Sequence, residues 1–174
     1  KSKSSTNKRQ TKAWLNSIGP VENLESYVKA DWWREIFNAN YLRTDGDVVE
    51  DDQLTKNEID LFVKFMSPSK DSTILDLCCG QGRHTFELAR RGFTNLYGLD
   101  RSHYLINKAK TANRKEGHSI IFKEGDARKL PFLNDKFDFV LLAGNSFGYF
   151  ESMKDDLTVL KAINRVLKPL GKLL

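Results

Sequence analysis

The 174-residue chain has the length and composition of a single globular domain. Its residues are 40% hydrophobic and 29% charged, a balance that excludes collagen-like, coiled-coil and largely disordered proteins. No apolar run reaches the roughly 18 residues of a membrane span, and the polar, basic N-terminus lacks the apolar segment of a secretory signal, so no membrane contact is expected. The two cysteines, Cys78 and Cys79, are adjacent and indicate reduced thiols in a cytoplasmic protein.

The net charge of +5 is confined to the first twelve residues, which hold five basic side chains and no acid. We interpret residues 1–12 as a basic flexible tail. The alternative, an arm for nucleic acid, is disfavoured because the tail has no aromatic side chain on which a base could stack. The neutral remainder of the chain also disfavours nucleic acid as a partner. No metal site is expected, because ligand spacing is absent for His84, His103 and His118.

After the tail, the sequence predicts helices that carry many aromatic side chains. We place a helical cap at 13–54, and its helix-favouring stretch at roughly 22–42 contains Tyr27, Trp32, Trp33, Phe37 and Tyr41. Thr55 and Glu58 match a capping box, and apolar residues recur behind them at helical spacing. An amphipathic helix is therefore expected over 55–66, with Pro68 ending it.

From residue 73 onward, short apolar runs alternate with helical stretches. Such alternation predicts right-handed βαβ units on a parallel sheet, that is, an α/β Rossmann-like fold with helices flanking the sheet. We expect a core at 55–174 with the sheet order 3-2-1-4. Residues 171–174 look like the start of another strand, so the core is expected to be incomplete after its fourth or fifth strand. The expected strands are 73–77, 95–99, 119–122 and 137–143, and the expected helices are 83–91, 102–115 and 154–167.

Two segments at strand ends indicate a nucleoside ligand. Gly80 and Gly82 lie where the first strand turns into a helix, and Asp100 ends the second strand, 20 residues after Gly80. A carboxylate at that place can accept hydrogen bonds from a ribose diol; the alternatives are a plain tight turn and a helix-capping acid. A dinucleotide is disfavoured because Thr85 stands where its third glycine would be, and because Asp76 would repel a pyrophosphate. Asp76 suits a nucleoside that carries a cationic amino acid.

Taken in order, the motifs resemble those of class I S-adenosylmethionine-dependent methyltransferases. The resemblance covers about residues 55–174 and rests on Asp76-x-x-x-Gly80-x-Gly82, Asp100, Gly125-Asp126-Ala127, Phe137-Asp138-Phe139-Val140 and Leu167-Lys168-Pro169-x-Gly171. The chain departs from the family pattern at Cys78, where a small residue, often glycine, is usual, and at Leu170, where glycine is usual. Because cysteine is small, we expect the first departure to matter little and the second to affect only the geometry of a turn.

The resemblance implies S-adenosylmethionine as the cofactor and roles for individual residues of this chain. Asp76 would organise the loop near the methionine amino group. The backbone at Cys79, Gly80 and Gly82 would line the methionyl and ribose portion, and Asp100 would hold the ribose hydroxyls.

The same resemblance places the adenine beside the next strand ends. Arg101 would lie next to the adenine, and Asp126 would meet its exocyclic amine, with Gly125 and Ala127 packing nearby. From the helical cap, Tyr41 would contact the cofactor. The sulfonium and the methyl acceptor would face Ala143, Gly144 and Asn145.

The function implied is in-line methyl transfer to a small metabolite or biosynthetic intermediate. Such a transfer needs alignment and desolvation. Neutral walls such as Phe147 and Tyr149 would suit the sulfonium, because their aromatic faces offer modest cation–π contact. No catalytic base is assigned, although His84 and His103 are candidates by residue type. The alternatives are a catalytically silent cofactor-binding or interaction module and, less favoured, a nicotinamide-dependent oxidoreductase. Ser146 stands where amino-group methylases of nucleic acids carry proline, which argues against adenine as the acceptor.

Overall fold

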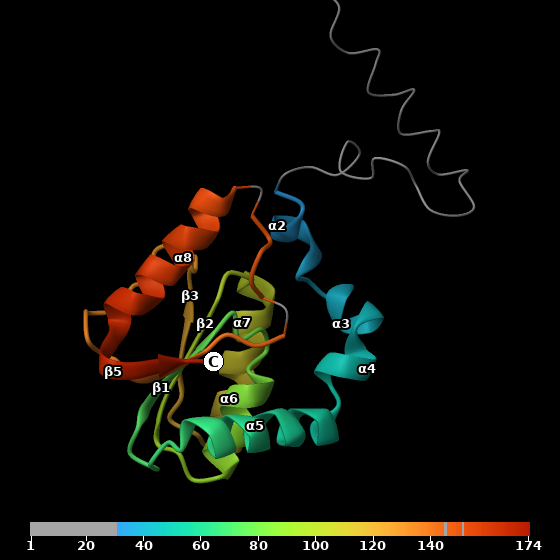
Figure 1. Cartoon of the computed structure of the whole chain (residues 1–174). Coiled ribbons are helices and arrows are strands. Elements are labelled where there is room, and N and C mark those ends of the chain that lie inside the picture. Colours follow the sequence, from blue (N-terminus) through green and yellow to red (C-terminus); the bar gives the residue numbers. More distant parts are fainter. Residues whose placement is uncertain (1–30, 145, 151) are drawn as a thin grey trace, which may run out of the picture. The chain divides into compact units, whose positions relative to one another are not determined.

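A five-stranded parallel sheet in the order β3-β2-β1-β4-β5 lies at the centre of the described part of the chain (Figure 1). The computed structural model describes residues 31–144, 146–150 and 152–174, so the expected tail at 1–12 and Tyr27 lie outside it. The observed order confirms the predicted fold class, the order 3-2-1-4 and the presence of a fifth strand. The strands are β1 (Thr73–Leu77), β2 (Asn95–Asp100), β3 (Ile121–Glu124), β4 (Phe137–Leu141) and β5 (Leu167–Leu173).

Helices precede and connect these strands, and all of them belong to one unit of the chain, Trp33–Leu174. Within the described residues, no helix combines the length and the hydropathy that a bilayer span requires. Among the described residues, three short helices come first, namely α2 (Trp33–Ile36), α3 (Tyr41–Thr44) and α4 (Gly46–Val49). Longer helices follow as α5 (Asp52–Met66), α6 (Arg83–Arg90), α7 (His103–Glu116) and α8 (Met153–Val166).

Two apolar layers hold the helices on opposite faces of the sheet (Figure 1). Successive residues of a strand point to opposite faces, so Ile74 packs with α5, α6 and α7, whereas Leu75 and Leu77 pack with α8. Most residues of these layers are nearly inaccessible to solvent. Because helices cover both faces, the carboxyl ends of the strands are left as the place where a ligand can bind.

The N-terminus of α5 differs from the predicted one. The helix begins at Asp52 rather than at residue 55, and Asp51 is its N-cap, with Oδ1 accepting from Leu54 N at 2.9 Å. Thr55 therefore lies inside the helix, where its hydroxyl donates to the Asp51 carbonyl at 2.9 Å. The predicted capping box of Thr55 and Glu58 was wrong, because Asp51, four residues before Thr55, caps the helix. Glu58 is therefore available for contacts outside α5.

The two strands at the edges of the sheet also differ from their predicted bounds. β3 begins at Ile121 instead of 119, because the Asn113 side chain binds both backbone groups of Ile120 before the strand starts. β5 begins at Leu167, directly after α8, and its pairing with β4 shifts register between Phe137 and Phe139. Between these two paired positions β5 contains more residues than β4. One of them is Leu170, whose φ of 68° lies in the left-handed region.

Candidate active site

A cleft lies at the carboxyl ends of β1, β2 and β4, and it has two lobes that meet. The α2 lobe, beside α2, has a cavity volume of about 130 Å³, and the α5 lobe, beside α5, has one of about 430 Å³. Together they fall within the roughly 300–1,000 Å³ that is typical of small-molecule sites. Both lobes are lined by Tyr41, Cys78, Gly80, Gly144, Ser146 and Tyr149.

The turn after β1 is bound to the end of β2. Cys79 N donates to the Leu99 carbonyl at 3.1 Å, and Gly80 N donates to Asp100 Oδ2 at 2.8 Å. Asp100 Oδ1 accepts from Ser102 N at 2.7 Å. The structure thus brings the predicted residues Cys79, Gly80 and Asp100 together at the junction of the two lobes.

The environment of Asp100 affects both its protonation and its capacity to bind. Burial raises the pKa of Asp100 above its ordinary value, although the backbone N–H groups of Ser102 and Gly80 favour the carboxylate. Each carboxylate oxygen accepts one backbone hydrogen bond, and each carries a further lone pair that can accept from a ligand hydroxyl.

Asp126 lies in the α2 lobe after β3, but its carboxylate is already engaged by Arg128. Arg128 donates through Nε to Asp126 Oδ1 at 3.0 Å and through a terminal nitrogen to Oδ2 at 2.7 Å, while its other terminal nitrogen donates to Asp155 at 3.1 Å. The Arg128 hydrogen bonds lower the pKa of Asp126. A nucleobase amine at Asp126 would therefore share this carboxylate with Arg128. The neighbouring residues Gly125 and Ala127 line the same lobe.

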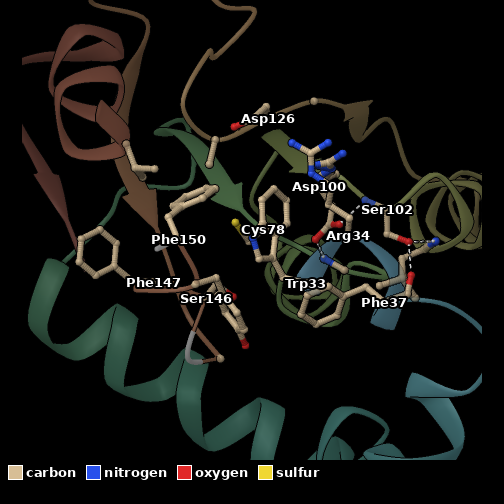
Figure 2. Close-up of a pocket in the computed structure, with 18 of the residues that line it drawn as sticks. Trp33, Arg34, Phe37, Cys78, Asp100, Ser102, Asp126, Ser146, Phe147 and Phe150 are labelled. Atoms are coloured by element: carbon tan, nitrogen blue, oxygen red, sulfur yellow. Dashed lines mark hydrogen bonds between the residues drawn. The ribbon is translucent and has the colours of Figure 1, made fainter. Parts of the chain in front are cut away.

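Trp33 forms a wall of the α2 lobe (Figure 2) and contacts Arg101. Its side chain is 8% exposed and packs edge-on against Phe150, with 5.1 Å between the ring centroids. The Arg101 guanidinium carbon lies 4.6 Å from the Trp33 ring centroid, within cation–π range. The structure thus places Arg101 in this lobe, as predicted, and adds Trp33 as its neighbour.

Tyr41 lies where the two lobes meet, and the segment after β4 lines the opposite side. Burial, followed by the charge of Asp45, raises the pKa of Tyr41, and its ring packs edge-on against Phe37 at 5.1 Å. Ala143 lines the α5 lobe and Gly144 lines both lobes. Asn145, also predicted at the site, lies outside the described residues.

Asp76 lies at the base of the α5 lobe, and Gly82 lies behind the surface of the cleft. Asp76 is 2% exposed at the base of the α5 lobe, where its Oδ2 accepts from the Thr85 hydroxyl at 2.6 Å and burial raises its pKa. Gly82 is the N-cap of α6 with φ of 89°, and a Cβ there would lie 2.8 Å from the Phe122 ring. It is not among the described residues that line either lobe. Both residues therefore shape the turn that presents Gly80.

Cys78, which departs from the family pattern, lies at a backbone position that favours glycine. Its φ is 60°, in the left-handed region that favours glycine, and its side chain lines both lobes. A non-glycine residue in this region costs about 1–2 kcal/mol. The expectation that this departure matters little considered the size of the side chain, and the left-handed backbone conformation adds this cost. Burial raises the pKa of the Cys78 thiol.

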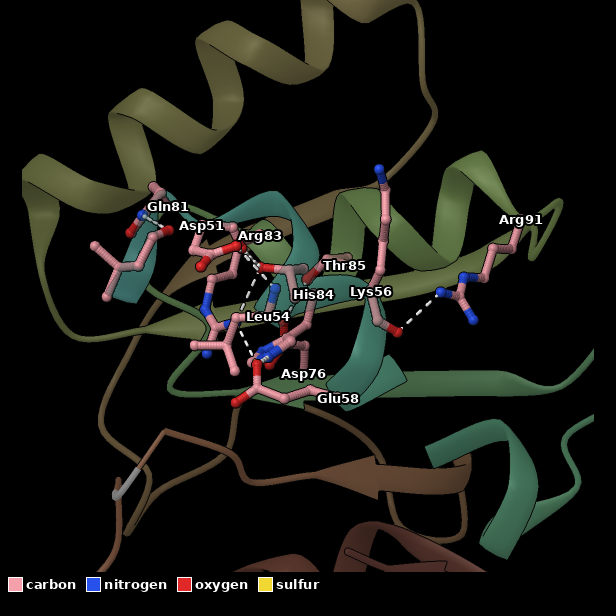
Figure 3. A network of polar contacts seen from close by, with 12 residues as sticks. Asp51, Leu54, Lys56, Glu58, Asp76, Gln81, Arg83, His84, Thr85 and Arg91 are labelled. Atoms are coloured by element: carbon pink, nitrogen blue, oxygen red, sulfur yellow. Dashed lines mark hydrogen bonds and ion pairs between the residues drawn. The ribbon is translucent and has the colours of Figure 1, made fainter. Parts of the chain in front are cut away.

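Sequence reasoning missed a polar network at the base of the α5 lobe (Figure 3). Glu58 Oε2 accepts a short hydrogen bond from Arg83 and a second one from His84 Nε2 at 2.8 Å. Burial favours a raised pKa for Glu58, but the hydrogen bonds from Arg83 and His84 outweigh it and lower that pKa. The sequence offered one indication of this network, the acid Glu58 in an otherwise amphipathic helix. Because Glu58 was interpreted as part of a capping box, its contact with α6 was not predicted.

Comparison with known proteins places this fold and cleft in a family. Residues 74–171 match the methyltransferase domain family. The chain is 40% identical over 114 residues to a demethylmenaquinone methyltransferase of Lactococcus lactis, covering 63% of this chain and 43% of that protein. It is 36% identical over 118 residues to a 2-phytyl-1,4-naphtoquinone methyltransferase of Nostoc punctiforme, covering 65% and 49%.

Among solved structures, the PH0226 protein of Pyrococcus horikoshii is 31% identical with a TM-score of 0.63, covering 77% of this chain and 63% of that one. The chain spans about half the length of the curated relatives it matches. The matched region contains the strands and turns that build both lobes of the cleft. The chain therefore belongs to the methyltransferase domain family, as a class I S-adenosylmethionine-dependent member.

Proposed function

We propose that this chain binds S-adenosylmethionine in the two-lobed cleft and methylates a small metabolite. The observation that carries the proposal is the hydrogen bond between Gly80 N and Asp100 Oδ2, at the junction of the two lobes. This hydrogen bond supports the proposal because Asp100, the predicted ribose acceptor, then lies beside the glycine turn, at the carboxyl ends of the strands where α/β folds bind nucleosides.

The groups that line each lobe fit different parts of this cofactor. In the α2 lobe, Asp100 would accept the ribose hydroxyls, and Arg101 and Ala127 would flank the adenine. The α5 lobe holds the acids Asp45 and Asp76, which suit an amino acid with a positive charge. When bound, S-adenosylmethionine supplies a methyl group on a sulfonium that a nucleophile can accept directly.

The junction and its rim would orient the acceptor and exclude water. Phe147 is 46% exposed on the α2 lobe, and Tyr149 packs edge-on against Phe37 with 5.8 Å between the centroids. These aromatic faces favour a planar, largely apolar acceptor. The two quinone-type relatives are named for such molecules, so we propose a quinol or a related aromatic metabolite.

The two histidines considered as bases have other contacts in the structure. His84 Nε2 is bound to Glu58 at 2.8 Å, and the His103 side chain is 76% exposed and pairs with Glu124. His103 is not among the described residues that line the lobes. We therefore assign no general base. We also propose that the described part of the helical cap, residues 33–49, covers the cleft. Both cysteines are free, which agrees with the proposed cytoplasmic location.

Calorimetric titration followed by a transfer assay tests the proposal. The chain is expected to bind S-adenosylhomocysteine with micromolar affinity and to bind NAD at least 100-fold more weakly. Methyl-labelled S-adenosylmethionine should then label an extractable 1,4-naphthoquinol. Binding of NAD alone would overturn the proposal, whereas binding of S-adenosylhomocysteine without any transfer would favour a silent cofactor-binding module.

A further inference from the structure

The α5 lobe has an uneven distribution of charge. Three carboxyl groups line it, those of Asp45, Glu58 and Asp76, but among its described lining residues the only guanidinium or ammonium group is that of Arg83. Arg83 is also the first residue of α6, so the positive end of that helix lies at the same place. An anionic ligand group that enters this lobe therefore meets its strongest attraction at Arg83.

Arg83 is held from one side only. A single terminal nitrogen, NH1, donates both to Glu58 Oε2 and to the Thr55 hydroxyl, the latter at 3.0 Å. The Arg83 side chain is 14% exposed, and its Nε and second terminal nitrogen make no hydrogen bond to another described residue. A guanidinium presents five N–H donors in a fixed fork, so this arrangement leaves a bidentate edge for a carboxylate.

Glu58 and Thr55 determine where that edge points. Both residues belong to α5, and His84 Nε2 binds the same Glu58 oxygen at 2.8 Å. The contact therefore fixes the Glu58 carboxylate between two donors from the first turn of α6 (Figure 3). Fixing one nitrogen of a planar guanidinium also fixes the direction of its other nitrogens.

We propose that Arg83 binds the α-carboxylate of the cofactor's amino-acid part, and that Glu58 is a positioning residue that orients the Arg83 guanidinium. This inference rests on the proposed function and identifies a residue that selects for the intact cofactor. The carboxylate is the only anionic group of S-adenosylmethionine, and its ammonium would face the acids of the same lobe. A nucleoside without the amino-acid part would make no use of Arg83.

The opposite end of α6 offers a matched control, because Arg91 also ties this helix to α5. Arg91 donates to Asp60 Oδ1 at 2.6 Å, to the Lys56 carbonyl at 3.0 Å and to Glu87 at 2.7 Å. Its guanidinium does not belong to the described lining of either lobe. If Arg83 served only to join α5 and α6, the two arginines would have equivalent effects on ligand binding.

The experiment compares two ligands by calorimetry on the full chain. S-adenosylhomocysteine carries the amino-acid carboxylate, whereas 5′-methylthioadenosine shares the nucleoside and lacks it. We expect Arg83→Gln to weaken S-adenosylhomocysteine binding by roughly 10- to 100-fold and methylthioadenosine binding by less than about twofold. Glu58→Gln should show the same selectivity at about 3- to 10-fold, and Arg83→Lys should lie between Arg83→Gln and the unmodified chain.

Each outcome bears on the inference. Arg91→Gln should leave the ratio of the two affinities unchanged. Equal losses for both ligands in Arg83→Gln, or no loss for either, would overturn the role of Arg83 and leave the proposed function intact. If the unmodified chain binds neither ligand, the proposed function fails and this inference with it. If Arg83→Gln does not fold, Arg83→Lys and Glu58→Gln give the same comparison.

Discussion

Asp100 and Asp126 follow neighbouring strands at the same edge of the sheet, yet their surroundings are opposite. Asp100 is enclosed and bound by backbone N–H groups, and burial raises its pKa. Asp126 is about one-third exposed and paired with Arg128, and this pairing lowers its pKa. The same residue type, at the end of β2 and just beyond β3, thus differs in the direction of its pKa shift and in the partners that a ligand must share or displace.

This comparison shows why the position of an acid in a motif does not define its role. The backbone bonds of Asp100 leave lone pairs directed toward a ligand, and these bonds also join two loops of the cleft. The bonds of Asp126 come from a side chain that competes with a ligand for the same oxygens. We therefore expect Asp100 to contribute much more to cofactor affinity than Asp126 does.

The largest expected effect is that of Asp100→Ala. Loss of two charge-assisted hydrogen bonds to the ribose should weaken S-adenosylhomocysteine binding by about 2–4 kcal/mol, or roughly 30- to 1,000-fold. Calorimetric titration measures this change, and circular dichroism verifies the fold. An unchanged affinity in a folded variant would remove ribose recognition from the role of Asp100.

The pH dependence of folding should have opposite signs for the two acids. Because the folded-state pKa of Asp100 is raised, its contribution to stability is present below its unfolded pKa of about 3.9 and is lost as pH rises through the folded value. The lowered pKa of Asp126 gives a contribution that is present above about 3.9 and is lost as pH falls through the folded value. Each slope is at most about 1.4 kcal/mol per pH unit.

Denaturant unfolding of the unmodified chain, Asp100→Asn and Asp126→Asn between pH 3 and 7 measures these slopes. The difference in unfolding free energy between the unmodified chain and each variant should fall with pH for Asp100 and rise for Asp126. Slopes of the same sign would contradict the contrast between the two sites.

A smaller effect on binding is expected for Asp126→Asn. Asparagine retains one acceptor oxygen, and Arg128 keeps its bond to Asp155, so the cofactor should bind at most about tenfold more weakly, or about 1.4 kcal/mol. Calorimetry under the conditions used for Asp100→Ala gives the comparison. A loss as large as that of Asp100→Ala would show that the two acids act equally.

The smallest effect should come from Arg128→Gln. The ion pair is about one-quarter to one-third exposed, so its loss should lower the unfolding free energy by about 1 kcal/mol or less. Cofactor affinity should stay within about threefold. A gain of tenfold or more would instead show that Arg128 blocks Asp126 from the nucleobase.

The sequence alone determined the strand order, both families of flanking helices and the meeting of Gly80 with Asp100. The alternation of strands and helices follows from hydrophobic periodicity and from the right-handed βαβ crossover, which operate over short stretches of chain. The strand order was predicted together with the resemblance to the family. The network of Glu58 with Arg83 and His84 could not be derived in this way, because α5 and the first turn of α6 meet only after the chain has folded.

Cys78 and Leu170 show the same division most clearly. The sequence identified both as departures from a glycine pattern, but only the folded backbone shows that both have left-handed φ angles, of 60° and 68°. The sequence likewise placed Asp126 after a strand with Arg128 two residues later, whereas only the folded chain brings Asp155 to the other side of the Arg128 guanidinium. Local patterns set which elements form, and contacts between distant segments set what each side chain at the cleft is free to bind.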